Sequence, residues 1–293
     1  MQTLEALRRK IKSAQDLMGV VRTMKALAAA SIRQYERAVE SLDHYNRTVL
    51  LGLQVALRNR PERLSRKSEN PALGAVVFGS DQGMCGQLND QIVAHALAEM
   101  EKFGPRRNER TVLVVGERAA GRLEDSGQSV EEVFAVPASI AGITPSVQQT
   151  LVHLQDWNSK RGIERIVLFY SEQLSGASYR PTTMHLLPLD SEWLARLQAE
   201  PWPTKVLPTF TMDWDRLFSA LVREYLFVSL YRAYAESLAS ENASRLASMQ
   251  GAERNIEERL GQLKAEFNHQ RQTSITEELL DITSGFEALT TDN

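Results

Sequence analysis

Proline is absent from both ends of this 293-residue chain. All ten prolines lie between Pro61 and Pro208, as do eleven of the sixteen glycines. Proline breaks the interior of a helix and glycine weakens it. Both ends are therefore free to form long helices, whereas the middle must be built from shorter elements. The sequence predicts an N-terminal helix over residues 1–60, a middle domain over 61–208 and a C-terminal helix over 209–293.

The N-terminal segment carries an apolar repeat with alternating steps of three and four residues. Fourteen of its sixteen positions are apolar. A repeat of 3.5 residues sustained over this length is typical of a coiled-coil seam rather than of a helix packed on a globular body. The positions are Leu4, Leu7, Ile11, Ala14, Met18, Val21, Lys25, Ala28, Ile32, Tyr35, Val39, Leu42, Asn46, Val49, Leu53 and Ala56.

The last end carries a second repeat of the same kind, with twelve apolar positions of sixteen. These are Phe218, Leu221, Tyr225, Val228, Arg232, Ala235, Ala239, Asn242, Leu246, Met249, Glu253, Ile256, Leu260, Leu263, Phe267 and Gln270. The phase then slips, and a new stripe follows Ile275, Leu279, Ile282, Phe286 and Leu289, so a different face is presented. The alternative is a pair of ordinary amphipathic helices packed on a globular body.

The charges of the two ends are opposite, at +6 for residues 1–60 and −6 for residues 209–293. Because the middle domain joins the two helices, they are expected to pair antiparallel. Matching the two repeats gives paired positions whose numbers sum to about 274, within roughly one helical turn. Leu53 should then lie near Leu221, Val39 near Ala235, Leu7 near Phe267, and Lys25 near Met249 and Glu253. Residues 271–289 should project unpaired, with their apolar stripe exposed.

The middle domain alternates predicted strands and helices, which favours an α/β sheet with crossover helices. Strands are predicted over 74–80, 111–116, 133–136, 165–171 and 184–189, and helices over 89–102, 117–125 and 146–160, the last after Pro145. Residues 58–70 and 201–209 are predicted linkers.

Composition and motifs argue against several classes of protein. The chain has no apolar run long enough to span a membrane, its start lacks the apolar core of a signal peptide, and a net charge of −3 does not suit a nucleic-acid binder.

Its single cysteine, Cys85, excludes an internal disulfide and a cysteine-built zinc site. The glycine-rich turn 79–86 lacks the Lys-Ser/Thr pair of a phosphate loop, so Gly83 and Gly86 are expected to permit a tight turn with Cys85 buried and inert. The five histidines show no metal-ligand spacing.

Several runs of small and hydrogen-bonding residues resemble those of one known family. They read TMKALAAASIR near the start, SDQGMCGQLN in the middle, and LASENASRLASM and RQTSITEELLDITSG near the end. On these residues the chain resembles the gamma subunit of the F-type ATP synthase, the central rotor shaft, in a divergent bacterial version. The resemblance implies an α/β fold with a long antiparallel coiled coil, in which a Rossmann-like domain is inserted between paired N- and C-terminal helices.

The resemblance also implies a function without catalytic residues, cofactor or metal. The implied partners are the alpha and beta subunits of a catalytic ring, the epsilon subunit and the membrane c-ring, at the cytoplasmic face of a bacterial inner membrane. Two departures from the family pattern are a serine, Ser31, where lysine is usual, and Lys25, where an acid is common. The competing hypothesis is a small-ligand-binding α/β enzyme whose arms only dimerise it. The implied partner-contact residues are Met24, Lys25, Arg245, Arg271, Gln272, Thr276 and Glu278.

Overall fold

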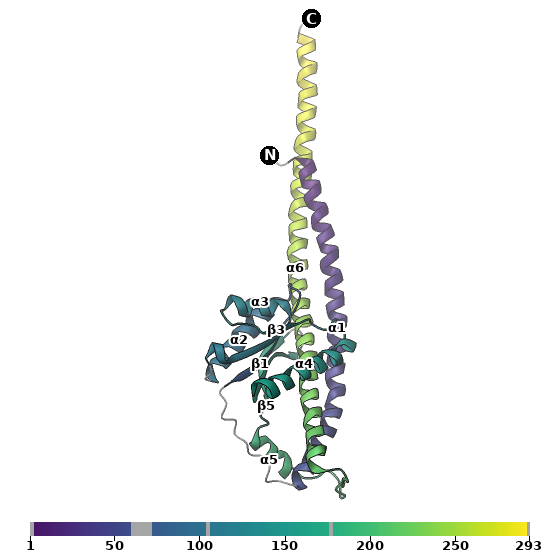
Figure 1. The fold of residues 1–293 in the computed structure, drawn as a ribbon. Helices are drawn as coiled ribbons and strands as arrows, with labels where there is room; N and C mark the ends of the chain where they lie inside the picture. The colour runs from purple at the N-terminus through teal and green to yellow at the C-terminus, as the bar shows by residue number, and fades with distance from the viewer. Residues whose placement is uncertain (1–2, 60–71, 104–105, 176–177, 292–293) are drawn as a thin grey trace. The chain divides into compact units, whose positions relative to one another are not determined.

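The structure is a computed structural model that describes residues 3–59, 72–103, 106–175 and 178–291. The chain divides into two compact units, one made of residues 1–27 and 247–293 and the other of residues 28–246. Two long helices, α1 (Leu4–Asn59) and α6 (Trp214–Thr291), contribute to both units (Figure 1). The three-segment division of the chain stays a prediction, because most of the linker at its first boundary, residues 60–71, lies outside the described part.

The larger unit contains a five-stranded sheet with the strand order β3-β2-β1-β4-β5. Strands β1, β2, β3 and β4 run parallel, and β5 pairs antiparallel with β4. This is the predicted Rossmann-like α/β arrangement. In chain order the elements are β1 (Leu73–Phe78), α2 (Leu88–Lys102), the short 3₁₀ helix η2 (Arg107–Glu109), β2 (Arg110–Val115), α3 (Glu117–Asp125), β3 (Glu132–Phe134), α4 (Ile140–Arg161), β4 (Arg165–Ser175), β5 (Ser178–Leu187) and α5 (Ser191–Ala199).

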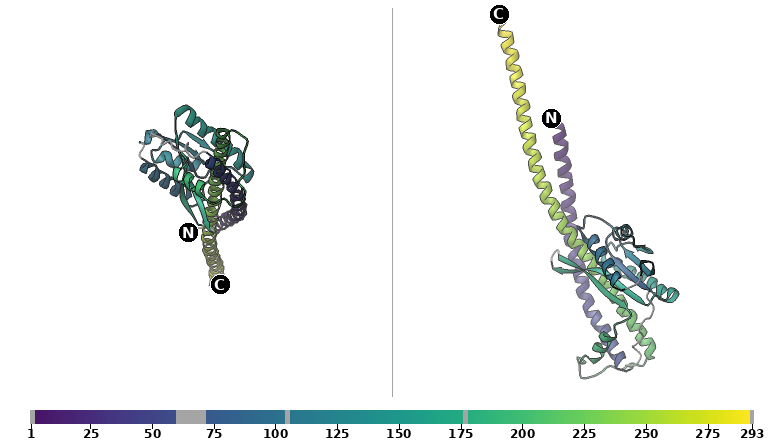
Figure 2. Two further views of the ribbon diagram at one scale, coloured as in Figure 1. Left: turned by 90° about the horizontal axis from the view of Figure 1, so that it is seen from below. Right: turned by 90° about the vertical axis from the view of Figure 1, so that its left-hand side faces the viewer.

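Both faces of the sheet are buried, which explains the continuous apolar runs in its parallel strands. On one face, Ala75, Val77 and Val114 pack against α2 and α3. On the other, Val76 and Phe78 pack with residues of α4 and with Tyr234 of α6. The α6 segment of this unit is therefore part of the domain core, and its ribbon runs close to the sheet (Figure 2).

Three sequence-based expectations for the middle domain were wrong in detail. Helix α4 begins at Ile140, so Pro145 lies in its second turn; the proline lacks one N–H donor there, and Ser146 Oγ donates to the Gly142 carbonyl oxygen at 3.0 Å. Strands β4 and β5 extend beyond the predicted ranges as a hairpin whose outer residues are polar. Helix α5 was not predicted; its N-cap is Asp190, whose carboxylate accepts the Glu192 N–H at 2.9 Å.

In the larger unit, α1 and α6 pair antiparallel in the predicted register. Leu53 and Leu221 share one apolar cluster, and Val39 packs against the cluster that contains Ala235. Where the end of α1 meets the start of α6, Trp214 Nε1 donates to the Ala56 carbonyl oxygen at 2.7 Å. The Trp214–Ala56 hydrogen bond joins positions whose numbers sum to 270, about one turn from the predicted 274, and so agrees with the antiparallel register in this unit.

The smaller unit continues the same register. Arg22 Nε lies 2.9 Å from Glu253 Oε1, and Lys25 pairs with the same carboxylate, as predicted. The Arg8 guanidinium lies 5.4 Å from the centre of the Phe267 ring, one residue from the predicted neighbour Leu7. The partner numbers in these contacts sum to between 275 and 278, within a turn of the value derived from the sequence.

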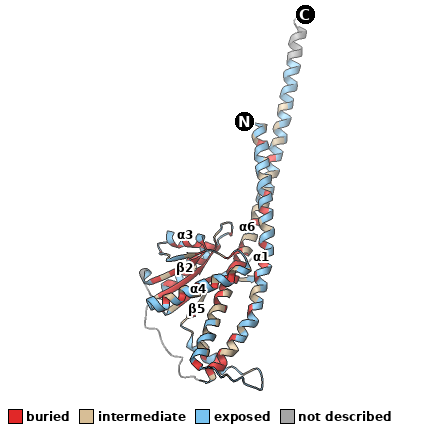
Figure 3. Ribbon diagram, turned by 45° about the vertical axis from the view of Figure 1, so that its right-hand side comes forward, coloured by how far each residue is buried: buried red, intermediate tan, exposed pale blue. Residues whose placement is uncertain are grey.

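Burial follows the two repeats closely. None of the sixteen positions in either repeat is exposed. Beyond Gln270 the pattern changes, because Ile275, Leu279 and Ile282 are 48%, 60% and 70% exposed. Figure 3 shows this end of α6 as largely exposed, and in Figure 1 it continues past the start of α1. The expected unpaired stripe is therefore present over these three residues; Phe286 and Leu289 lie outside the side chains that the structure describes.

The register predicts a specific disulfide crosslink. In a Cys85→Ser background, Leu7→Cys with Phe267→Cys should crosslink efficiently under mild oxidation, because the two positions face each other in the seam. The product is measured as a mobility shift on a denaturing gel. Stronger crosslinking of Leu7→Cys with Phe286→Cys would show that the helices are slid by several turns.

Two glycines of the larger unit should respond to alanine in opposite directions. A Cβ at Gly79 would meet the Ala119 Cβ at 2.3 Å, so Gly79→Ala should destabilise the unit by about 1–3 kcal/mol through overpacking. A Cβ at Gly121, inside α3, would meet nothing within 4 Å, and Gly121→Ala should stabilise it by about 0.5–1 kcal/mol. Urea unfolding measures both changes. Equal effects at the two positions would contradict the close packing of Gly79, just after β1, on Ala119 of α3.

Candidate functional site

The glycine-rich turn between β1 and α2 is held by its own polar side chains. Asn89 Oδ1 accepts the Ser80 N–H at 3.0 Å, and Asn89 Nδ2 donates to Ser80 Oγ at 2.8 Å. Ser80 Oγ in turn donates to the Gln82 carbonyl oxygen at 2.8 Å. Cys85 is 2% exposed, which confirms that it is buried.

The backbone of this turn differs from the expectation at one glycine. Gly86 has a φ of 58°, in the left-handed region that favours glycine. The second left-handed residue is Met84, with a φ of 62°, rather than Gly83. Gly86 therefore serves the tight turn as predicted, whereas no such requirement is found at Gly83.

Asp81 connects the turn to two other loops of the sheet. Its Oδ1 accepts the Glu117 N–H at the start of α3 at 3.1 Å, and its Oδ2 accepts the Val136 N–H after β3 at 2.9 Å. Asp81 therefore ties the turn after β1 to the start of α3 and to the segment after β3.

The small residues of α6 allow the sheet domain to approach this helix closely. Ser244 Oγ donates to the Cys85 carbonyl oxygen at 2.6 Å, and Ser240 Oγ donates to the Ser171 carbonyl oxygen at 2.9 Å. Ala239 and Ala243 are buried between them. The runs SDQGMCGQLN and LASENASRLASM therefore meet as two halves of one contact that fixes the α/β domain on α6.

Arg245 lies at the end of this contact. It forms an ion pair with Glu241 one turn earlier at 2.5 Å, and the side chains of Arg245 and Glu241 are only 11% and 8% exposed. Burial raises the pKa of the Glu241 carboxyl, and the charge of Arg245 opposes this shift. The pair is therefore held inside the larger unit, and Arg245 keeps little free surface in this chain.

Met24 and Lys25 belong to the smaller unit, and both are half-buried. The Lys25 ammonium and the Arg22 guanidinium both bond the Glu253 carboxylate, and these bonds lower the pKa of that carboxyl. Arg22 also reaches Glu257 at 3.1 Å. A cation at a seam position is thereby neutralised across the helix pair.

The four remaining predicted contact residues lie together near the C-terminal end of α6. Arg271, Gln272, Thr276 and Glu278 are all exposed. The Thr276 hydroxyl donates to the Gln272 carbonyl oxygen of its own helix at 2.9 Å. No ion pair within the described part of the chain engages Arg271 or Glu278. The structure thus groups these four side chains at an unpaired helix end, whereas Met24 and Lys25 lie elsewhere in the smaller unit and Arg245 belongs to the larger unit.

Sequence reasoning missed a charged cluster centred on the buried Glu236 of α6. Arg232 pairs with Asp43 of α1 and lies 3.6 Å from Glu236. Burial raises the pKa of Glu236 to about 7; Glu172 and Asp43 add to the shift, and the charge of Arg232 opposes it. The sequence signal was the charged pair Arg232 and Glu236 inside an otherwise apolar and small-residue stretch.

Two further kinds of feature are absent from the described residues. These residues contain no group of three or more His, Cys, Asp or Glu side chains arranged to hold a metal ion. None of their helices is both long enough and apolar enough to cross a membrane.

Together these features define a class of protein: an α/β domain fixed by close contact on a long helix pair, with an exposed, unpaired helix end. Comparison with known proteins identifies the family. The family model described as ATP synthase matches residues 3–289. The chain belongs to the ATP synthase gamma-chain family, whose members are non-catalytic subunits.

The relatives cover the whole chain. The ATP synthase gamma chain of Synechococcus sp. (strain PCC 6716) is 28% identical over 315 residues, which cover 99% of this chain and 100% of the relative. That of Nostoc sp. (strain PCC 7120) is 29% identical over 320 residues, with coverage of 99% and 100%. That of Pelagibacter ubique is 25% identical over 297 residues, again with 99% and 100%.

Two solved structures share the fold. The rotor of the Euglena gracilis mitochondrial ATP synthase matches with a TM-score of 0.63 and 17% identity, covering 93% of this chain and 98% of that one. The central stalk of the Tetrahymena thermophila mitochondrial ATP synthase, solved with its c-ring, matches with a TM-score of 0.58 and 19% identity, covering 80% and 99%. The likeness confirms the predicted fold class.

The buried carboxyl of Glu236 predicts a pH dependence of stability. A folded-state pKa of about 7 exceeds the unfolded value of about 4.3, so the folded protein binds this proton more tightly. The contribution of Glu236 to stability is then fully present below pH 4 and is lost as the pH rises through 7. Glu236→Gln should therefore stabilise the protein by roughly 1–3 kcal/mol at pH 8 and change little at pH 4.

Urea unfolding at the two pH values measures this difference, and the exposed Glu266→Gln provides the control. A Glu236→Gln variant that is equally destabilised at both pH values would show that the carboxylate is ionised and stabilising in its pair with Arg232.

Proposed function

We propose that this chain is the central-stalk rotor of a membrane-associated F-type ATP synthase. It transmits torque between an ion-driven ring in the membrane and nucleotide sites on other chains. The observation that carries the proposal is the exposed apolar stripe at the end of α6, on a chain of the gamma family. An unpaired apolar stripe is costly in water and marks a partner surface.

The helix pair supplies the stiffness that a shaft needs. A single helix bends readily, whereas two helices that interdigitate along a continuous seam resist bending and twisting together. Ion pairs across the seam, such as Arg22–Glu253 at 2.9 Å, add little energy but help to fix the register. Torque applied to one unit is then carried along both helices.

The end of α6 is the proposed contact with a ring of alpha and beta subunits. Ile275, Leu279 and Ile282 would sit in an apolar sleeve, and Arg271 and Gln272 would bond acidic loops of the ring in turn. Arginine suits this role because its planar fork of donors matches a carboxylate. Thr276 and Glu278 lie at the same helix end, where they would meet the same ring.

The remaining proposed contacts are distributed along the chain. Met24 and Lys25 lie within the paired region and would contact the ring near its entrance. Arg245 is a further proposed contact with the ring; within this chain its guanidinium pairs with Glu241, one turn earlier on α6. The α/β domain is proposed to bind the epsilon subunit and the c-ring, and the complex would hold the chain at the cytoplasmic face of a bacterial inner membrane.

The competing hypothesis was an α/β enzyme with a dimerisation arm. The family membership of the chain does not support it.

Co-purification from the source cell tests the proposal directly. A tag on the chain should recover a ring of three alpha and three beta subunits that hydrolyses ATP, whereas the isolated chain should not bind ATP. Recovery of the chain as a dimer with no ATP-binding subunits would contradict it.

The tip contacts predict a loss of coupling. Arg271→Ala with Gln272→Ala should lower coupled ATP turnover of the assembled complex by about tenfold, equivalent to the loss of one charge-assisted hydrogen bond. Helix content by circular dichroism should not change, because both side chains are exposed.

A matched control is available on the same helix. Arg259 Nη1 donates to Gln262 Oε1 at 2.9 Å, and both residues are exposed within the paired region. Arg259→Ala with Gln262→Ala should leave turnover unchanged. Equal turnover in both double variants would remove Arg271 and Gln272 from the contact.

A further inference from the structure

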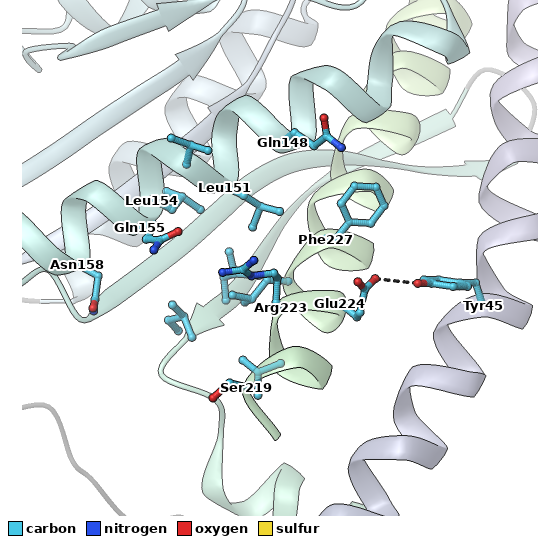
Figure 4. Close-up of a pocket in the computed structure, with 15 residues that line it drawn as sticks. Tyr45, Gln148, Leu151, Leu154, Gln155, Asn158, Ser219, Arg223, Glu224 and Phe227 are labelled. Atoms are coloured by element: carbon cyan, nitrogen blue, oxygen red, sulfur yellow. Dashed lines mark hydrogen bonds between the residues drawn. The ribbon is translucent and has the colours of Figure 1, made fainter. Parts of the chain in front are cut away.

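A groove in the larger unit lies between α4, β5 and the first turns of α6, with Tyr45 of α1 at one side (Figure 4). Its volume is about 700 Å³, within the range of small-molecule binding sites. None of the proposed partner-contact residues lines this groove. All of its lining residues belong to one compact unit, so its shape does not depend on the placement of the other unit.

The floor of the groove is apolar. Leu154 and Leu186 are buried beneath it, and Leu151, Leu226 and Phe227 are half-buried at its surface. Val152, at its edge, is 63% exposed. These side chains pack against the domain core on one side and are accessible to solvent on the other. An alkyl or aryl group that binds on them is removed from water, which contributes a free energy of about 25 cal/mol per Å² of buried apolar surface.

One cation projects into this apolar groove. The Arg223 side chain extends from α6 toward α4 in Figure 4. No carboxylate among the described residues pairs with its guanidinium. The neighbouring acid, Glu224, points the other way and accepts a hydrogen bond from the Tyr45 hydroxyl at 2.7 Å, so it is engaged across the helix pair.

The remaining polar lining is uncharged. Gln148, Gln155 and Asn158 of α4 line the opposite wall, and their amides can donate to or accept from a bound polar group. A single guanidinium with neutral amides and an apolar floor matches a ligand with one negative charge and an apolar body. A polyanion would leave its further charges unpaired, and an organic cation would find no partner at Arg223, while the Glu224 carboxylate is engaged by the Tyr45 hydroxyl.

We propose that this groove binds an amphipathic monoanion, with a carboxylate on Arg223 and an alkyl chain along Leu151, Leu226 and Phe227. Free long-chain carboxylates and anionic lipids share this chemistry. The inference does not depend on the rotor function, because it uses only the side chains of the groove.

Isothermal titration of the full chain with dodecanoate, below its micelle concentration, tests the proposal. Arg223→Gln should raise the Kd at least tenfold. Val152→Asp, which places a negative charge at the exposed edge, should raise it in the same direction. The control is Arg216→Gln, an exposed arginine on the same helix outside the groove, which should leave the Kd unchanged.

A cationic ligand of equal chain length separates charge recognition from apolar adsorption. Dodecyltrimethylammonium should bind the unaltered chain at least tenfold more weakly than dodecanoate. Equal binding of the two ligands, or equal weakening by Arg223→Gln and Arg216→Gln, would overturn the proposal.

Co-sedimentation with phosphatidylglycerol vesicles distinguishes the two sources of the ligand. Vesicle binding that is lost in the Arg223→Gln variant shows that the ligand of the groove is a membrane lipid. Retained dodecanoate binding without vesicle binding assigns a free carboxylate. If neither dodecanoate nor the vesicles bind, the groove has no such ligand.

Discussion

The apolar seam between α1 and α6 is the interaction on which the rest of the structure depends. Every position of both repeats is at least half-buried, and the contacts in each unit follow one antiparallel register. Burial of the seam must supply most of the stability of the smaller unit, because the exposed ion pairs that accompany it contribute only about 0–1 kcal/mol each. The seam also sets where pairing ends, and so leaves the last turns of α6 without an internal partner.

The second constraint is the close approach of the α/β domain to α6. Small residues such as Ala239 and Ala243 make room for the sheet, and the serines Ser240 and Ser244 bond its carbonyl groups directly. The same helix is therefore both a seam partner of α1 and part of the core of the domain. A rotation of the domain around the α6 segment of the larger unit would break these bonds.

The sequence predicted the features that depend on strict periodicity or on proline. The two repeats fixed the helix pair, its register and the unpaired stripe, because a slip of one position would expose the whole apolar set. The outer part of the β4–β5 hairpin was not predicted because its residues are polar. Helix α5 was not predicted because it is short and depends on the packing of Leu194 and Leu197 against residues distant in sequence. The start of α4 was misplaced because Pro145 was taken as a boundary. The raised pKa of Glu236 depends on burial by residues distant in sequence, so no local pattern could reveal it.

Amide hydrogen exchange on the free chain and on the assembled complex tests whether the apolar seam ends near Gln270 and leaves the end of α6 unpaired. If the seam ends near Gln270 and the helix beyond it is unpaired in the free chain, amides of residues 275–284 should exchange much faster there than those of residues 249–267. Assembly should then protect them. Equal protection of both segments in the free chain would show that the tip is already packed, and would contradict the account.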